Sequence, residues 1–130
     1  MKIAVTSKSD KLESEIDPRF GRCSYFLIVD IENMSFESIS NESSMASGGA
    51  GIRAAQTVAK AGADIVVTGN MGPNAFQTLS AAGIMVFIGA HGTVKEAIEK
   101  YKKGELEKID SANVGSHFGM KTKGRDFRRG

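Results

Sequence analysis

The stretch of residues 65–76, IVVTGNMGPNAF, constrains the fold more than any other part of the chain. It opens with an unbroken run of β-branched residues, which is typical of a strand buried on both faces. Gly69 and Gly72 follow, and Pro73 stands where a helix would start, a position at which its missing N–H costs no hydrogen bond. We expect Gly72 to adopt a positive φ angle. The order predicts strand, tight turn and helix, and leaves open whether the turn only connects these elements or contributes to a binding site.

The composition indicates one globular domain, since 41% of the 130 residues are hydrophobic and 25% are charged. A net charge of +2 is too small to indicate nucleic-acid binding. The cations gather in residues 121–130, which we expect to be a disordered, solubilising end. A single cysteine, Cys23, excludes an internal disulfide and fits a reducing compartment. No signal peptide or membrane-length apolar run is visible, so we expect a cytoplasmic protein without membrane contact.

Hydrophobic patterning predicts five strands and three helices. The strands are expected at 2–7, 24–31, 34–40, from 65 and at 84–88, and the helices at 52–61, 73–82 and from 93 to a stop at Gly104. Thr93 and Glu96 form a capping-box pattern at the start of the last helix. Residues 8–18 are expected to form a loop. We therefore predict a domain over residues 1–104 and a C-terminal segment over residues 105–130, in which no strong periodicity is visible.

The predicted order of elements is three strands, a helix and two further strand–helix pairs, which allows few topologies if crossovers are right-handed. The simplest places the first, fourth and fifth strands parallel, the second antiparallel beside the first, and the third at an edge. This is an α/β fold of the ribonuclease-H-like, three-layer kind. Its five-stranded mixed sheet has the order 3-2-1-4-5, with strand 2 antiparallel.

This topology brings four loops to one edge of the sheet, which we call the rim. The loops are residues 8–23, 43–51, 69–73 and 89–93. All three helices are expected to start at the rim and to present free N–H groups and partial positive charge. Open α/β sheets bind ligands outside the carboxyl ends of their strands. We therefore predict that the rim binds an anion.

The candidate binding residues all lie in these loops. They are Arg19, Gly21, Arg22, Gly49, Gly51, Gly69, Asn70, Gly72 and His91. The two arginines form either an anion clamp or surface salt bridges to Asp17 or Asp10.

Two side chains, one of them already named, are candidate metal ligands. His91 lies in the rim loop before the last helix, where it is either a ligand or an exposed loop residue without a role. Cys23 is either a thiolate ligand or a small buried hydrophobe before a strand. A second histidine, His117, lies in a segment that either folds over the rim as a lid or has no role.

Several stretches resemble one known family. They are the opening MKIAV, Phe20-Gly21-Arg22 before an apolar strand, Gly49-Ala50-Gly51-Ile52, the central stretch from Thr68 to Phe76, and Gly92-Thr93-Val94. The chain resembles the dinitrogenase iron–molybdenum cofactor biosynthesis family, which includes NifX and the C-terminal domain of NifB, and among its members the stand-alone small domains. The resemblance implies a ribonuclease-H-like fold and binding of a metal–sulfur cofactor or its precursor. It also implies a cluster-assembly or acceptor protein as partner.

The residues exclude some activities that this fold class can support. A two-metal nuclease needs several carboxylates at the strand ends, and residues 2–7 and 65–70 contain none. No nucleophile–base–acid arrangement is visible, so we expect no enzyme. We predict a non-enzymatic carrier or scaffold for an anionic metal–sulfur cofactor.

A single cysteine cannot supply four thiolates, so any iron–sulfur or molybdenum–iron–sulfur cluster would be loosely held, delivered preassembled or shared across a dimer. The alternative is a small regulatory or interaction domain that binds a phosphate-bearing ligand. The glycines at 48–51 before a helix suit a phosphate equally well, although the Lys-Ser/Thr ending of a P-loop is missing.

Overall fold

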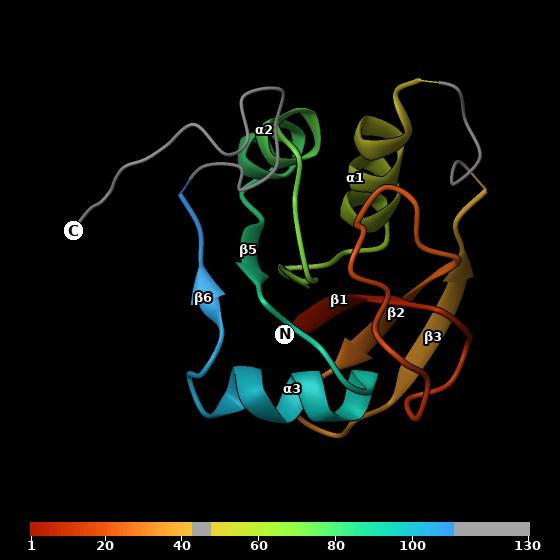
Figure 1. The fold of residues 1–130 in the computed structure, drawn as a ribbon, viewed down its shortest axis with the longest axis vertical. Helices are drawn as coiled ribbons and strands as arrows, with labels where there is room; N and C mark the ends of the chain where they lie inside the picture. Colours follow the sequence, from red (N-terminus) through yellow and green to blue (C-terminus); the bar gives the residue numbers. More distant parts are fainter. Residues whose placement is uncertain (43–47, 111–130) are drawn as a thin grey trace.

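The computed structural model describes residues 1–42 and 48–110 (Figure 1). Its elements are β1 (Lys2–Ser7), β2 (Tyr25–Asp30), β3 (Phe36–Ser40), α1 (Ala50–Lys60), β4 (Ile65–Val67), α2 (Pro73–Ala81), β5 (Met85–Ile88), α3 (Val94–Lys102) and β6 (Glu107–Lys108). The predictions for His117 and for the basic residues 121–130 lie outside the described residues. None of the described helices is long and apolar enough to cross a membrane.

The strands form one mixed sheet of order β3-β2-β1-β4-β5-β6 (Figure 1). β1, β4 and β5 are parallel, and β2 is antiparallel to β1. The predicted order 3-2-1-4-5 and the direction of the second strand are confirmed. The predicted count of five strands is wrong, because β6 pairs antiparallel with β5 after the last helix.

β6 was missed because its two exposed, charged residues show no hydrophobic pattern. Ile109, which follows it, is 8% exposed and packs into the core. Its amide donates to the carbonyl oxygen of Val86 over 3.1 Å. The sheet therefore continues beyond Gly104, into the segment in which the sequence shows no strong periodicity.

Alternation along the strands gives the sheet two apolar faces. Neighbouring residues of β1, such as Ala4 and Val5, enter separate hydrophobic clusters on opposite faces. α1 and α2 cover one face, and α3 covers the other (Figure 1). The predicted three layers are thus present, and the sheet interior is apolar on both sides.

Candidate functional site

The rim is assembled by backbone hydrogen bonds between the loops that follow β1, β4 and β5. The amide of Gly89 donates to the carbonyl oxygen of Gly69 over 3.1 Å, which joins the loops after β5 and β4. The amide of Asn70 donates to the carbonyl oxygen of Pro18 over 2.8 Å, which joins the loops after β4 and β1. The predicted convergence of these three loops is therefore confirmed.

Residues 16–21, which we call the strap, cross the ends of β1 and β4. The Thr6 hydroxyl donates to the carbonyl oxygen of Asp17 over 2.6 Å, and the Asp17 amide donates to the carbonyl oxygen of Thr6 over 3.1 Å. The Thr6 hydroxyl also lies 2.9 Å from the hydroxyl of Thr68. These three residues are at most 3% exposed. Buried polar groups with satisfied hydrogen bonds fix the strap on the sheet.

Three glycines lie where other atoms approach closely, two of them where the strap meets neighbouring backbone and one at the contact between α1 and α2. A Cβ at Gly69 would lie 2.7 Å from Cα of Pro18, and a Cβ at Gly21 would lie 3.0 Å from the amide nitrogen of Gly51. A Cβ at Gly51 would lie 3.2 Å from Cβ of Ala75. The strap therefore packs on the turn between β4 and α2, which we call the central turn, and on the start of α1. The start of α1 in turn packs on α2.

α1 and α2 both begin at the rim without a side-chain cap. Gly49 precedes α1 with φ 72°, which only glycine adopts readily. Gly72 precedes α2 with φ −83° and ψ 169°, so the expected positive φ at this residue is wrong. Glycine has no side chain, so the residue at the N-cap position caps neither helix. Since Gly51 contacts Ala75, the uncapped first turns lie side by side.

The start of α3 differs from the starts of α1 and α2. The Thr93 hydroxyl accepts from the Glu96 amide over 3.1 Å, and the Glu96 carboxylate accepts from the Thr93 amide over 2.9 Å. These hydrogen bonds lower the pKa of Glu96. The amides of the first two helical residues donate to the carbonyl oxygens of Ser14 and Leu12. The capping box is confirmed, but the expected free N–H groups at this helix are wrong.

The two arginines of the strap region have different surroundings. Arg19 is exposed, and its Nε lies 3.2 Å from Oδ1 of Asp17, which is buried. The Arg19 amide also donates to that carboxylate over 3.0 Å, and the side-chain hydrogen bond from the guanidinium to Asp17 raises the pKa of Arg19. The alternative that Arg19 forms a salt bridge to Asp17 is therefore confirmed. Arg22 is exposed and lies just before β2.

The position of Arg22 is fixed by its neighbours. Nδ2 of Asn41, which is 5% exposed, donates to the carbonyl oxygens of Gly21 and Cys23 over 3.1 and 2.9 Å. The amide of Asn41 donates to the carbonyl oxygen of Ser24. One buried side chain thus clamps the backbone on both sides of Arg22.

Cys23 is fully buried, and its thiol donates to the carbonyl oxygen of Phe20 over 3.3 Å. Burial raises the pKa of Cys23 to about 12, with a smaller contribution from the negative charge of Asp17. The side chain is therefore a thiol at neutral pH, whereas a metal ligand must be a thiolate. That Cys23 ligates a metal stays a prediction, and its burial and pKa count against it.

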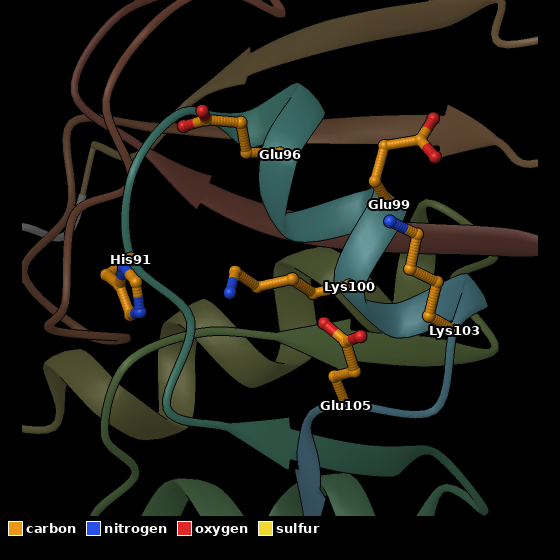
Figure 2. A pocket seen from close by; sticks show the side chains of 6 residues that line it. All are labelled: His91, Glu96, Glu99, Lys100, Lys103 and Glu105. Atoms are coloured by element: carbon orange, nitrogen blue, oxygen red, sulfur yellow. The ribbon is translucent and has the colours of Figure 1, made fainter.

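His91 is exposed and lines a groove along α3, on the sheet face opposite α1 and α2 (Figures 1 and 2). The groove is lined by His91, Glu96, Glu99, Lys100, Lys103 and Glu105. Figure 2 shows His91 on the loop before α3, with the Lys100 side chain extending toward it and Glu105 on the segment after α3. Within residues 1–42 and 48–110, no three His, Cys, Asp or Glu side chains are grouped to hold a metal ion. A metal-ligating role for His91 stays a prediction.

Four buried polar residues that organise the rim were not among the sequence candidates: Thr6, Asp17, Asn41 and Thr68. A signal for two of them was present. Thr6 and Thr68 interrupt apolar runs near the ends of two strands predicted to be neighbours, which is where a buried hydroxyl pair can anchor a loop. Asn41 gave no signal, because its partners are backbone carbonyls about twenty positions earlier in the chain.

Comparison with known proteins identifies the family. Residues 1–104 match the family model described as dinitrogenase iron-molybdenum cofactor, so the chain belongs to that family.

Three relatives show how far the similarity extends. The apo form of the orange protein from Desulfovibrio gigas is 42% identical and superimposes with a TM-score of 0.84, covering 87% of this chain and 96% of that chain. A protein from Thermotoga named as a candidate NifB protein is 35% identical, with a TM-score of 0.75, and covers 85% of this chain and 94% of that chain. An uncharacterized protein from Methanocaldococcus jannaschii is 33% identical over 113 residues, which are 85% of this chain and 92% of the relative.

Proposed function

We propose that this protein is a non-enzymatic carrier or scaffold that binds an anionic metal–sulfur cofactor or its precursor at the rim. Membership of the dinitrogenase iron-molybdenum cofactor family supports the class of cargo. One observation supports the location of the binding site: α1 and α2 both start without a side-chain cap, and their first turns are in contact at Gly51 and Ala75. α3, whose first amides are all bonded, serves as a contrast within the same molecule.

The chemistry of the paired helix starts suits an anion with several outer sulfur or oxygen atoms. Each helix start carries about half a positive charge on N–H groups without intrahelical partners. Two such starts side by side offer several donors to one ligand. Hydrogen bonds to a charged acceptor are each worth about 1.5–3 kcal/mol. The cargo would thus be held by its outer atoms, which suits a protein that must also release it.

Arg22 is the side chain that we assign to this site. It is exposed and lies next to Gly21, whose Cα packs against the start of α1. The hydrogen bonds from Asn41 to the carbonyl oxygens of Gly21 and Cys23 hold the backbone on both sides of Arg22, which supports this assignment. Arg19 has a different role, because its guanidinium balances the buried carboxylate of Asp17 and so holds the strap. We propose that delivery to a cluster-assembly or acceptor protein follows binding at the same rim.

The proposal is tested by anaerobic reconstitution with ferrous iron, sulfide and molybdate, followed by gel filtration. Iron, molybdenum and sulfide are then measured in the protein fraction, together with its visible absorbance. We expect metal and sulfide to co-elute with the wild-type protein, and much less with Arg22→Ala. Lys60→Ala removes the same charge at the far end of α1 and should behave as wild type. Loss of all metal on the column, together with thermal stabilisation by nucleotides, would instead support the phosphate-binding alternative.

A further inference from the structure

β3 forms an open edge of the sheet. Within residues 1–42 and 48–110, it pairs with β2 alone and is the last strand on its side. Figure 1 shows β3 at the margin of the fold, further out than α1 and α3. Its sequence, FESIS, contains no proline and no lysine, and its register with β2 has no bulge. An edge without these features can accept another strand.

The opposite edge of the sheet is guarded. β6 has only two residues, Glu107 and Lys108, and both are charged and exposed. Short edge strands and charged edge residues are two of the devices by which proteins prevent pairing between sheets. The two edges therefore differ, and among the described strands β3 is the one suited to pairing.

The direction of the free backbone groups follows from the ladder between β2 and β3. The Asp30 amide donates to the Ser35 carbonyl oxygen at one end of the ladder, and the Asn41 amide donates to the Ser24 carbonyl oxygen at the other end. In an antiparallel pair, residues that bond to the neighbouring strand alternate with residues whose backbone groups point away. The residues of β3 that point away from β2 are Phe36, Ser38 and Ser40.

These free groups are complementary to those of a second copy of the same strand. If two β3 strands pair antiparallel with Ser38 opposite Ser38, Phe36 of each copy lies opposite Ser40 of the other. All three residues then occupy hydrogen-bonded positions of the new ladder, so each free amide and carbonyl group finds a partner. The side-chain sizes fit as well, because a serine lies at the two-fold axis and another lies opposite each phenylalanine.

The charge of the strand favours this register over its neighbours. Glu37 is the only charged side chain of β3. A two-fold axis at Glu37 would place two glutamates directly opposite each other, which is destabilising. An axis at Ile39 would leave Phe36 without a residue of β3 opposite it. With the axis at Ser38, Glu37 lies opposite Ile39, and the two glutamates are only diagonal neighbours, about 7–8 Å apart.

We propose that this protein forms a two-fold symmetric dimer, in which the β3 strands of two copies pair antiparallel about Ser38 and join two six-stranded sheets into one. The assembly closes at two copies, because the outer edges of the joined sheet are the guarded β6 strands. Five strand residues from each copy are fewer than the about 20–30 of a standard interface, so the dimer is weak and reversible.

In this dimer each copy keeps its own rim. β3 runs parallel to β1, because both are antiparallel to β2. Antiparallel pairing of two β3 strands therefore turns the two rims toward opposite ends of the joined sheet. One cluster shared between the two rims is excluded by this geometry. The dimer itself does not depend on the proposed cargo binding.

Sedimentation velocity of the full-length chain, between about 10 µM and 1 mM, tests for the dimer. We expect the sedimentation coefficient to rise with concentration from that of a monomer toward that of a dimer. Ser38→Lys places two cations opposite each other at the axis and should raise the Kd of the dimer about twofold to fivefold. Ser80→Lys adds the same charge at an exposed position of α2 and should leave the Kd unchanged.

Disulfide cross-linking tests the register. In Ser38→Cys the two new thiols face each other across the axis, with Cα atoms about 5.5 Å apart, a separation that a disulfide spans. In Ser40→Cys the two positions lie four residues apart along the paired strands, about 14 Å, which no disulfide spans. We expect mild oxidation to link Ser38→Cys into a dimer and to leave Ser40→Cys monomeric. Cys23, which is fully buried, should not take part.

Three results would overturn the proposal. One is sedimentation of the wild-type protein as a monomer at about 1 mM. Another is an equal Kd for Ser38→Lys and Ser80→Lys, which would place the contact on another surface. The third is equal cross-linking of Ser38→Cys and Ser40→Cys, which would indicate random collision or a different register. Circular dichroism of each variant shows that it is folded before its association is compared.

Discussion

The contact between the strap and the central turn can be tested by adding one methyl group. In Gly69→Ala, the new Cβ would lie 2.7 Å from Cα, 2.8 Å from Cβ and 3.0 Å from the carbonyl oxygen of Pro18. Two of these atoms are backbone, so no side-chain rotation relieves the clash. The strap and the turn must therefore separate. That separation disturbs the hydrogen bond from the Asn70 amide to the Pro18 carbonyl oxygen, which is 2.8 Å long.

The cost follows from these two effects. Overpacking a filled site costs about 1–3 kcal/mol, and a lost intramolecular hydrogen bond costs about 0.5–1.5 kcal/mol. We expect Gly69→Ala to lower the free energy of unfolding by about 2–4 kcal/mol. With a urea dependence of about 2 kcal/mol per molar, the unfolding midpoint falls by about 1–2 M.

Equilibrium unfolding in urea, followed by circular dichroism, measures this change. Gly48→Ala is the matched control, because a Cβ at Gly48 has no atom within 4 Å and the residue has no positive φ. It should leave the midpoint unchanged or raise stability by up to about 1 kcal/mol. If Gly69→Ala unfolds at the wild-type urea midpoint, Pro18 of the strap does not pack closely against Gly69.

Three further predictions concern side chains. Arg22→Ala should weaken cargo binding by about 1–3 kcal/mol in titrations, while Lys60→Ala binds as wild type; equal loss in both variants would indicate unspecific charge attraction. Cys23 should react with Ellman's reagent at pH 8 only after unfolding. Because the pKa of Cys23 is raised to about 12 in the folded protein, the stability that it contributes is present at neutral pH and is lost as the pH rises above the ordinary thiol pKa. Comparison with Cys23→Ala isolates that loss, and rapid labelling of the native protein would contradict the burial. Thr93→Ala should lower the free energy of unfolding, measured in urea, by about 1 kcal/mol. The stability contributed by Glu96, whose pKa is lowered in the folded protein, should be lost as the pH falls below the ordinary glutamate pKa. If the unfolding free energy of Thr93→Ala depends on acid pH as that of the wild type does, the capping role is contradicted.

The sheet order could be predicted from sequence because each central strand carries its own signal. The run at residues 65–67 and the alternation of β1 mark buried strands, and glycines mark the ends of all three helices. Right-handed crossovers then leave one simple order. The capping box at Thr93 and Glu96 was readable because both partners lie within four residues. Local patterns therefore determine most of the fold.

The details of the rim depend on contacts between distant residues, which sequence patterns do not encode. The amides at the start of α3 looked free because nothing nearby in the sequence indicates that the carbonyls of Leu12 and Ser14 accept from them. The pairing of Arg19 with Asp17 was foreseen as an alternative, but the burial of Asp17 that makes the pair structural was not. Gly72 looked like a positive-φ residue, although its backbone is extended.

The central claim is that the cargo sits on the paired starts of α1 and α2. Two-dimensional NMR of the 15N-labelled protein, titrated anaerobically with the reconstituted metal–sulfur species, tests it directly. We predict shifts or broadening of the amides of Gly51, Ile52 and Ala75, in the first turns of α1 and α2. The amides of Val94 and Lys95 at the start of α3 should stay unchanged, since both are already bonded to the loop after β1. Changes confined to the start of α3 and the groove at His91, with the first turns of α1 and α2 unaffected, would contradict the account.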